Sequence, residues 1–254
     1  MRMDRHLIIN KLYDLAEELN ITILYAVEIG SRAYKVEHTN SDHDIGIIYK
    51  HTIDNYLKVN RPKEAFHLQL TESIEVHGWD IYKMSNLLLK SNSSLYEWLN
   101  SDIVYIENGE IIREIKARWI HSFSLLKLAM HYQQMAVRNL KLYNEREDNN
   151  SKLLFQSVRC YLVTNWIITK RTHPPIIFLE LLKQNFEEEA QGWFQEIYRV
   201  KRMEQKLVLK VEKLHGYLDE KLNRMLPTIK QLQNDKIALA DINELLLKEL
   251  INHD

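Results

Sequence analysis

The sequence predicts an α+β protein in which a small mixed sheet with helices is followed by an all-helical C-terminal domain. Short apolar runs rich in β-branched and aromatic residues occur before residue 108, whereas apolar residues after Gly109 recur at helical spacing. Only 6 Gly and 4 Pro among 254 residues favour long regular elements. We therefore place a domain boundary near residue 108, with a head at residues 1–108 and a helical domain at residues 109–254.

In the head, residues 3–20 are expected to form an amphipathic helix because their apolar residues recur at helical spacing. Four apolar stretches are predicted to be strands: residues 21–29, 44–50, 71–83 and 102–107. Residues 51–70 carry little periodicity and are assigned to a helix or loop with a break at Pro62. Two short helices precede the last strand and separate near Asn92, with Ser93 or Ser94 as the expected N-cap.

In the second domain, residues 113–145 form one continuous helical pattern. Three further helices are expected after it: residues 151–171, a short one at 176–184, and a long one from Trp193 that stops before Pro227. Residues 238–251 are the last predicted helix. The head is therefore expected to carry the sheet, and the rest of the chain to be helical throughout.

Composition points to a soluble cytoplasmic protein. The formal net charge is −1, so contact with nucleic acid requires a local basic patch rather than an overall positive field. The single cysteine, Cys160, excludes an internal disulfide and fits a reducing compartment. Charges interrupt the first 20 residues, which excludes a signal-peptide pattern, and no apolar run reaches the length of a membrane span. The sequence does not indicate an oligomeric state.

Residues 30–46, GSRAYKVEHTNSDHDIG, carry the main functional signal. Gly30 and Ser31 form a turn after an apolar strand, and backbone N–H groups of such a turn can bind phosphate. Asp42 and Asp44 open the next strand, and residues i and i+2 of a strand share a face. Two adjacent carboxylates repel each other unless a divalent cation lies between them. The pattern therefore predicts Mg²⁺ (or Mn²⁺) beside a nucleoside triphosphate (NTP).

A Gly-Ser turn followed by Asp-x-Asp between two apolar strands resembles the nucleotidyltransferase superfamily typified by DNA polymerase β. The segments GSRAY, SDHD and VHGWDIYKMSNLLLKSNSSLYEWLNSDIVY resemble, more narrowly, its RNA-repair-associated (RNA-ligase-associated) family. The similarity extends through HYQQMA and KLLFQSVRCYLVTNW to HPP, so it spans most of residues 28–185. This chain departs from the family pattern at Lys35, often Gly there, and at Gly46, often Arg there.

The resemblance implies a polymerase-β-like head that needs a third carboxylate on a neighbouring strand, as general base or metal ligand. Two residues compete for this role. Asp80 occupies the position of the family's GWD motif and is preferred on that ground, although an N-cap for the following helix would also explain it. Glu75 lies five residues earlier and faces the opposite side of an unbroken strand. His77 is expected to be structural or peripheral.

Further residues are assigned to nucleotide binding. Gly30, Ser31 and Arg32 would contact the β- and γ-phosphates, unless Arg32 pairs with Glu28 or Glu37 instead. In the helical domain, the resemblance draws attention to Lys152 and Arg159, which are seven residues apart and share a helix face. A parallel polar stripe lies on the preceding helix: Lys127, His131, Gln134, Arg138 and Lys141. Two such stripes could line a cleft for triphosphate or RNA, or could simply be solvated.

The expected reaction is in-line attack of a hydroxyl on the α-phosphate of an NTP, with transfer of a nucleoside monophosphate (NMP). Asp42, Asp44 and Asp80 would hold two cations that stabilise the attacking and leaving oxygens. An RNA end is the preferred acceptor, because the resemblance is to proteins of RNA repair. The alternatives are a hydroxyl of a protein or small molecule, or a catalytically silent nucleotide-binding module with a regulatory role.

Overall fold

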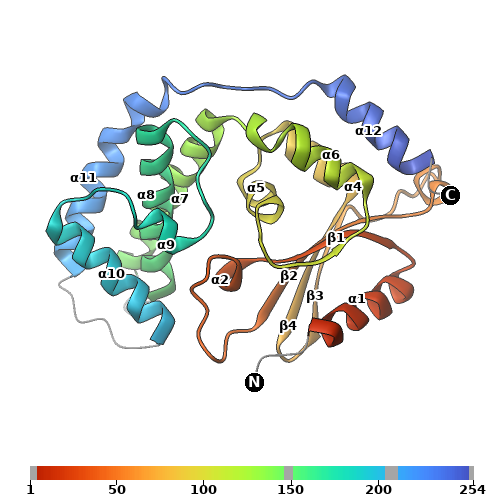
Figure 1. Ribbon diagram of the computed structural model, residues 1–254, viewed down its shortest axis with the longest axis horizontal. Helices are drawn as coiled ribbons and strands as arrows, with labels where there is room; N and C mark the ends of the chain where they lie inside the picture. Colours follow the sequence, from red (N-terminus) through yellow and green to blue (C-terminus); the bar gives the residue numbers. More distant parts are fainter. Residues whose placement is uncertain (1–4, 146–150, 204–210, 252–254) are drawn as a thin grey trace. The chain divides into compact units, whose positions relative to one another are not determined.

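The computed structural model describes residues 5–145, 151–203 and 211–251, and its described part divides into two compact units (Figure 1). The head unit contains residues 5–33, 39–123 and 236–251. The helical unit contains residues 34–38, 124–145, 151–203 and 211–235. No described helix has the length and apolar character needed to cross a membrane.

A five-stranded mixed sheet organises the head unit, with strand order β3-β4-β2-β1-β5. Its strands are β1 (Thr22–Glu28), β2 (His43–Lys50), β3 (Ala65–Thr71), β4 (Ile74–Asp80) and β5 (Val104–Glu107). The strands β2 and β4 pair in parallel and the other neighbours pair antiparallel. The predicted α+β class, with a small mixed sheet followed by a helical region, is confirmed.

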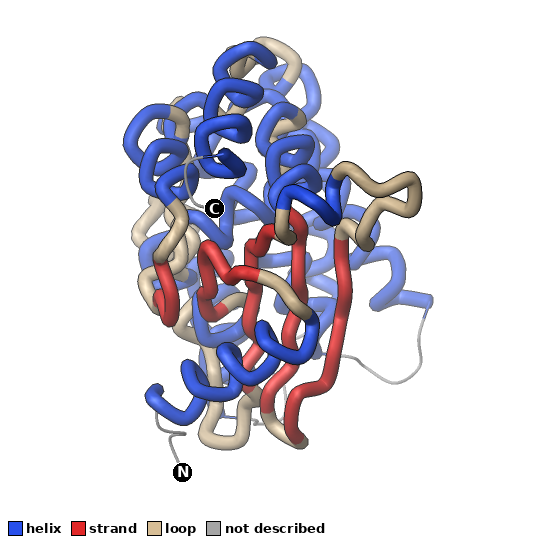
Figure 2. Tube along the Cα trace, turned by 90° about the vertical axis from the view of Figure 1, so that its right-hand side faces the viewer, coloured by secondary structure: helices blue, strands red, loops and turns tan. Residues whose placement is uncertain are grey.

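One face of the sheet packs against α1 (Arg5–Leu19), as Figure 2 shows. The helix contributes Ile8, Leu12 and Leu15 to a core that also contains Ile45 and Val76 from the two central strands. Because side chains alternate along a strand, the even-numbered residues of β2, Asp44 among them, point to the opposite face. The apolar core on the α1 face therefore anchors the strand whose opposite face carries Asp44.

The opposite face carries α4 (Ile81–Leu89), α5 (Ser93–Leu99) and α6 (Glu110–Arg118). Trp98 of α5 stacks on Trp79 of β4, with ring centroids 3.7 Å apart, and covers Gly46. The N-cap of α5 is Asn92, whose side chain accepts the N–H of Leu95, rather than Ser93 or Ser94. Two short elements complete this part of the chain: α3 (Ile53–Tyr56) and the 3₁₀ turn η1 (Ile120–Ser122).

The last helix of the described chain, α12 (Leu239–Ile251), packs against α4 and α6 of the head unit (Figure 1). The buried Lys50 ammonium donates to the carbonyl of Glu249 at 2.8 Å, and the Glu249 carboxylate accepts the N–H of Ile111 at 2.9 Å. The head unit also extends to residue 123. The compact units therefore differ from the predicted division into 1–108 and 109–254, because α12 belongs to the head unit.

The helical unit consists of α7 (Leu125–Glu145), α8 (Ser151–Lys170), α9 (Phe178–Leu181), α10 (Glu188–Met203) and α11 (Val211–Ile229). The helix α8 packs against α7, α10 and α11. Residues 34–38, which follow the Gly-Ser turn in sequence, belong to this unit. There the carbonyl of Tyr34 accepts the N–H of Phe178 at 3.1 Å.

Several predicted elements differ from the structure. Residues 113–145 are not one helix, because α6 ends at Arg118 and α7 begins at Leu125 after the 3₁₀ turn. The edge strand β3 lies in the stretch assigned to a helix or loop. The helix α11 continues through Pro227 to Ile229, and residues 204–210 of the long helix predicted from Trp193 lie outside the described residues. The four predicted strands correspond to β1, β2, β4 and β5.

Candidate functional site

The Gly-Ser turn lies against the carboxylate of Asp44. Gly30 follows β1 with a φ of +65°, and a Cβ on this residue would lie 2.7 Å from Asp44 Oδ2. The neighbouring Ile29 donates its N–H to the Asp44 carbonyl at 2.8 Å. Glycine is therefore required both by the left-handed backbone and by the close approach of the carboxylate. Ser31 and Arg32 continue from Gly30 into α2 (Gly30–Ala33), a single short turn of helix.

The two aspartates lie at the start of β2. Asp42 directly precedes the strand and is exposed, His43 is buried, and Asp44 is half-buried. The alternation within β2 directs Asp44 to the sheet face opposite α1, and a shared cation site with Asp42 stays a prediction. The Gly-Ser turn and the Asp44 carboxylate thus lie next to each other in the head unit.

A buried carboxylate, Glu28, supports this arrangement from the last position of β1. It accepts the backbone N–H of Asp44 at 3.2 Å and contacts His43 Nδ1 at 2.9 Å. Tyr105 of β5 also donates its hydroxyl to Glu28. Burial, and then the adjacent Glu28, raise the pKa of Tyr105, so this hydroxyl stays protonated as a donor. Sequence reasoning named Glu28 only as a partner for Arg32, although an acidic residue ending an apolar strand signals such a buried network.

Arg32 holds the end of the loop that leads to the aspartates. Its guanidinium donates to the carbonyls of Asp42 at 3.0 Å and Ser41 at 2.6 Å. It also lies 3.9 Å from a carboxylate oxygen of Glu28, which is one of the pairings that the sequence left open. These contacts fix the backbone of the Asp-x-Asp segment. The prediction that Arg32 also binds phosphate stays a prediction.

Asp80 does not join the two aspartates, which corrects the preferred assignment of the third carboxylate. In the β2–β4 pairing, Asp80 lies opposite Tyr49, whereas Asp44 lies opposite Glu75. Five residues of strand separate the two positions by about 16 Å, and the odd spacing turns Asp80 to the other face of the sheet. Asp80 is only 2% exposed. In this register the structure does not bring Asp80 together with Asp42 and Asp44.

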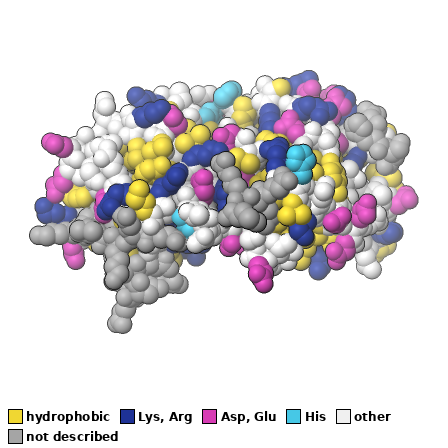
Figure 3. Space-filling view, turned by 60° about the horizontal axis from the view of Figure 1, so that its bottom comes forward, with side chains coloured by type: hydrophobic (Ala, Val, Ile, Leu, Met, Phe, Trp, Pro, Cys, Tyr) yellow, Lys and Arg dark blue, Asp and Glu magenta, His cyan; other side chains and the backbone are white. Residues whose placement is uncertain are grey.

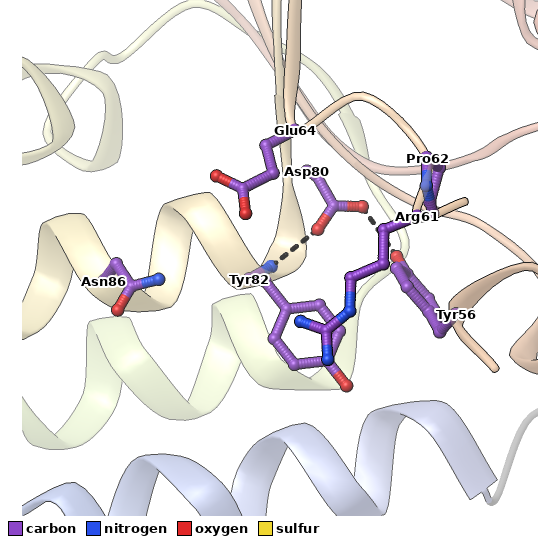
Figure 4. A pocket seen from close by; sticks show the side chains of 7 residues that line it. All are labelled: Tyr56, Arg61, Pro62, Glu64, Asp80, Tyr82 and Asn86. Atoms are coloured by element: carbon purple, nitrogen blue, oxygen red, sulfur yellow. Dashed lines mark hydrogen bonds between the residues drawn. The ribbon is translucent and has the colours of Figure 1, made fainter. Parts of the chain in front are cut away.

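Asp80 instead has the structural role that the sequence left as its alternative. Its carboxylate accepts the N–H of Tyr82 at 2.8 Å as the N-cap of α4, and the hydroxyl of Tyr56 at 2.6 Å (Figure 4). Burial raises the pKa of Asp80 against the opposing effect of these hydrogen bonds. The adjoining cavity, lined also by Arg61 and Glu64, has about 180 Å³, below the roughly 300–1,000 Å³ of ordinary ligand sites.

Glu75 is the other candidate for the third carboxylate, and its position differs from that of Asp80. It lies directly opposite Asp44 across the parallel β2–β4 pair, so the two side chains point to the same face. The Glu75 side chain is 31% exposed and contacts His77 Nε2 at 3.4 Å and His67. Burial, and then the neighbouring His67, lower the pKa of His77 against the opposing effect of Glu75. The sequence signal was the single carboxylate between the apolar Ile74 and Val76.

The two departures from the family pattern have physical counterparts in the structure. Lys35 has a φ of +58°, a left-handed conformation in which glycine is favoured, and Arg202 donates to its carbonyl at 3.3 Å. At Gly46, a Cβ would lie 2.7 Å from the indole ring of Trp98. No larger side chain fits at residue 46 while Trp98 keeps this position.

The two basic residues proposed for nucleotide binding lie in different environments of the helical unit. Lys152 is exposed in the first turn of α8, whereas Arg159 is 3% exposed. The Arg159 guanidinium stacks on the ring of Tyr34 at 4.1 Å and lies 5.7 Å from that of Tyr132. On the face of the molecule in Figure 3, side chains of both charges are interspersed. Nucleotide binding by Lys152 and Arg159 stays a prediction, and the structure adds a packing role for Arg159.

Comparison with known proteins identifies the family of the chain. The family model RlaP, described as "RNA repair pathway DNA polymerase beta family", matches residues 4–248. The chain belongs to this family. As an RlaP-family protein it is a polymerase-β-like nucleotidyltransferase by family, which confirms the resemblance drawn from the motifs.

One curated relative of this RlaP-family chain is an uncharacterized protein, YcgL, of Bacillus subtilis (strain 168). The two are 29% identical over 244 residues, which is 94% of each chain. A solved structure, a nucleotidyltransferase-like protein from Exiguobacterium sibiricum 255-15, is 11% identical with a TM-score of 0.36, covering 87% of this chain and 76% of that one.

Proposed function

We propose that this RlaP-family protein transfers an NMP from an NTP to a hydroxyl acceptor, with Mg²⁺ (or Mn²⁺) held by Asp42, Asp44 and Glu75. The observation that carries the proposal is the β2–β4 register, which aligns Glu75 with Asp44 on one sheet face. Carboxylate oxygens are the donors that these hard cations prefer. When bound, the cations would stabilise the charge that develops on the attacking and leaving oxygens.

The protein's own residues would divide the remaining work. The backbone at Gly30 and Ser31 would receive the triphosphate, because its glycine leaves room beside Asp44. Glu75, half-exposed beside Asp44, would accept the proton of the attacking hydroxyl. Arg32 and Glu28 would keep the Asp-x-Asp backbone in place through the hydrogen bonds described above.

An RNA end is the acceptor we favour, and its support is the RNA-repair description of the family. RNA would be held through local basic groups, Lys152 among them, because the net charge of −1 gives no general attraction to a polyanion. Cytoplasmic localisation belongs to the same proposal, since RNA repair and a single buried cysteine both fit a reducing compartment.

The test is incubation of the full chain with α-labelled NTPs, Mg²⁺ and RNAs that differ in their ends, with Asp42→Ala as the inactive control. We expect label on RNA with the wild type and a loss of at least about a hundredfold in the variant, as for removal of an essential catalytic group. Label on protein or on a small molecule would show that the acceptor hydroxyl belongs to that molecule and not to RNA. NTP binding without any transfer would identify a silent nucleotide-binding module.

A further inference from the structure

A second group of metal-ligating side chains lies on the β3–β4 hairpin, next to the proposed carboxylate site. His67 and His77 are directly paired across the two antiparallel strands, and Glu75 lies two residues before His77 on the same face. The two imidazole rings stack with centroids 4.3 Å apart and an interplanar angle of 8°. One ligand atom from each of the three residues lies within 4.8 Å of the others.

The donor set distinguishes this group from the aspartate pair. Two imidazole nitrogens and one carboxylate oxygen match the His₂Glu set of zinc sites that keep one coordination position open. Ligand atoms at about 2.05 Å from a tetrahedral zinc are about 3.4 Å apart. His77 Nε2 and Glu75 Oε1 are already 3.4 Å apart, and His67 Nε2 contacts the same carboxylate oxygen. The two imidazole rings would have to rotate out of their stacked arrangement for the three atoms to surround one ion.

The group is also accessible to an ion from solvent. The exposed fractions of the His67, His77 and Glu75 side chains are 58%, 36% and 31%. At such exposure an ion pair between a histidine and a carboxylate contributes little to folding stability, so stability alone does not require three such groups together. The strands pair in regular antiparallel register from Ala65 opposite Trp79 to Gln69 opposite Glu75, and this register fixes the backbone spacing of the three residues.

We propose that His67, Glu75 and His77 form a zinc site that shares Glu75 with the nucleotidyl-transfer carboxylates. Zn²⁺ prefers imidazole nitrogen, whereas Mg²⁺ prefers oxygen ligands, so the two cations select different partners for Glu75. Glu75 bound to Zn²⁺ is withdrawn from Asp44, and Zn²⁺ therefore inhibits transfer. This second step rests on the proposed function; zinc binding itself does not.

The binding step is tested by isothermal titration calorimetry of ZnCl₂ into the full chain, without nucleotide or Mg²⁺. Relative to the wild type, His67→Ala and His77→Ala should each weaken zinc binding by at least about tenfold, since even outer-sphere partners of a metal ligand contribute this much. His121→Ala, which removes an exposed histidine elsewhere in the head unit, should not change the affinity. Zinc K-edge absorption should detect two imidazole ligands in the wild type and none in a variant that carries both His67→Ala and His77→Ala.

Equal zinc affinity in the wild type and both hairpin variants would overturn the site, as would an absorption spectrum with oxygen ligands alone. Circular dichroism checks that each variant is folded. We expect both to fold, because His67 and His77 are partly exposed on the hairpin. These results do not depend on any enzymatic activity, so they stand even if no acceptor is found.

The inhibitory step is tested by adding ZnCl₂ to the Mg²⁺-supported transfer reaction and comparing each protein with its own zinc-free rate. Micromolar zinc should strongly inhibit the wild type and His121→Ala. The zinc concentration that halves the rate should be at least about tenfold higher for His67→Ala and for His77→Ala. Zinc binding without this difference in sensitivity would overturn the sharing of Glu75. Absence of transfer in zinc-free wild type would overturn the proposed function and leave the calorimetric result intact.

Discussion

The two ends of β4 carry carboxylates with opposite roles. Glu75 is partly exposed, lies opposite Asp44 and contacts His67 and His77, which are also partly exposed. Asp80 is buried, lies opposite Tyr49 and satisfies a helix N-terminus and a tyrosine hydroxyl. Five residues separate them along one strand. The role of each carboxylate therefore depends on its sheet face and on the residue opposite it, rather than on the sequence motif that contains it.

The largest expected effect is on transfer in Glu75→Gln. Removing this carboxylate should lower the transfer rate by about 10²-fold or more, because the variant loses both a general base and an anionic ligand. The rate is measured with labelled NTP at saturating Mg²⁺. Glu72→Gln, which changes an exposed carboxylate in the turn of the same hairpin, is the matched control and should keep the wild-type rate. Equal rates in the two variants would remove Glu75 from the site.

The next effect is on stability, in Asp80→Ala. The change leaves the Tyr82 N–H and the Tyr56 hydroxyl without their acceptor, so the free energy of unfolding should fall by about 2–3 kcal/mol. Urea unfolding of the full chain measures this loss. The rate per folded molecule should stay at the wild-type value, and a selective loss of transfer in a stable Asp80→Asn protein would restore Asp80 to the site.

A smaller effect is expected from Tyr105→Phe, which removes the hydroxyl that donates to the buried Glu28. The loss of one hydrogen bond to a charged acceptor should cost about 1.5–2 kcal/mol of unfolding free energy. Because Glu28 also accepts the N–H of Asp44, the Michaelis constant for Mg²⁺ should rise as the aspartate backbone loosens. Tyr13→Phe, an exposed tyrosine on α1, provides the control, and identical Mg²⁺ dependence in both proteins would confine Tyr105 to a packing role.

Much of the head was predictable because its signals are local. The strands on either side of the Gly-Ser turn, and the face shared by Asp42 and Asp44, depend on composition and alternation within a few residues. The edge strand β3 was missed although Phe66, Leu68 and Leu70 alternate regularly with polar residues, because this short run follows a proline break in a polar stretch. Edge strands of this kind bury little, and their composition resembles a loop.

The third carboxylate and the domain boundary could not be predicted because they depend on pairing between distant segments. The choice between Glu75 and Asp80 requires the register of β4 against β2, which a single strand does not reveal. The return of α12 to the head depends on Lys50 and Glu249, which are 199 residues apart. The continuation of α11 through Pro227 likewise requires its packing partners, since the residue alone predicts a helix end.

The pairing of Lys50 with Glu249 has a consequence for biosynthesis. The Lys50 ammonium is buried against Glu249 of α12, so this pair can form only after residues 239–251 have been translated. The last strand of the sheet ends at Glu107, whereas α12 is translated only after the helical unit. The nascent head therefore lacks this cover while the helical unit is made, and we expect a chain shortened before α12 to have a less stable head.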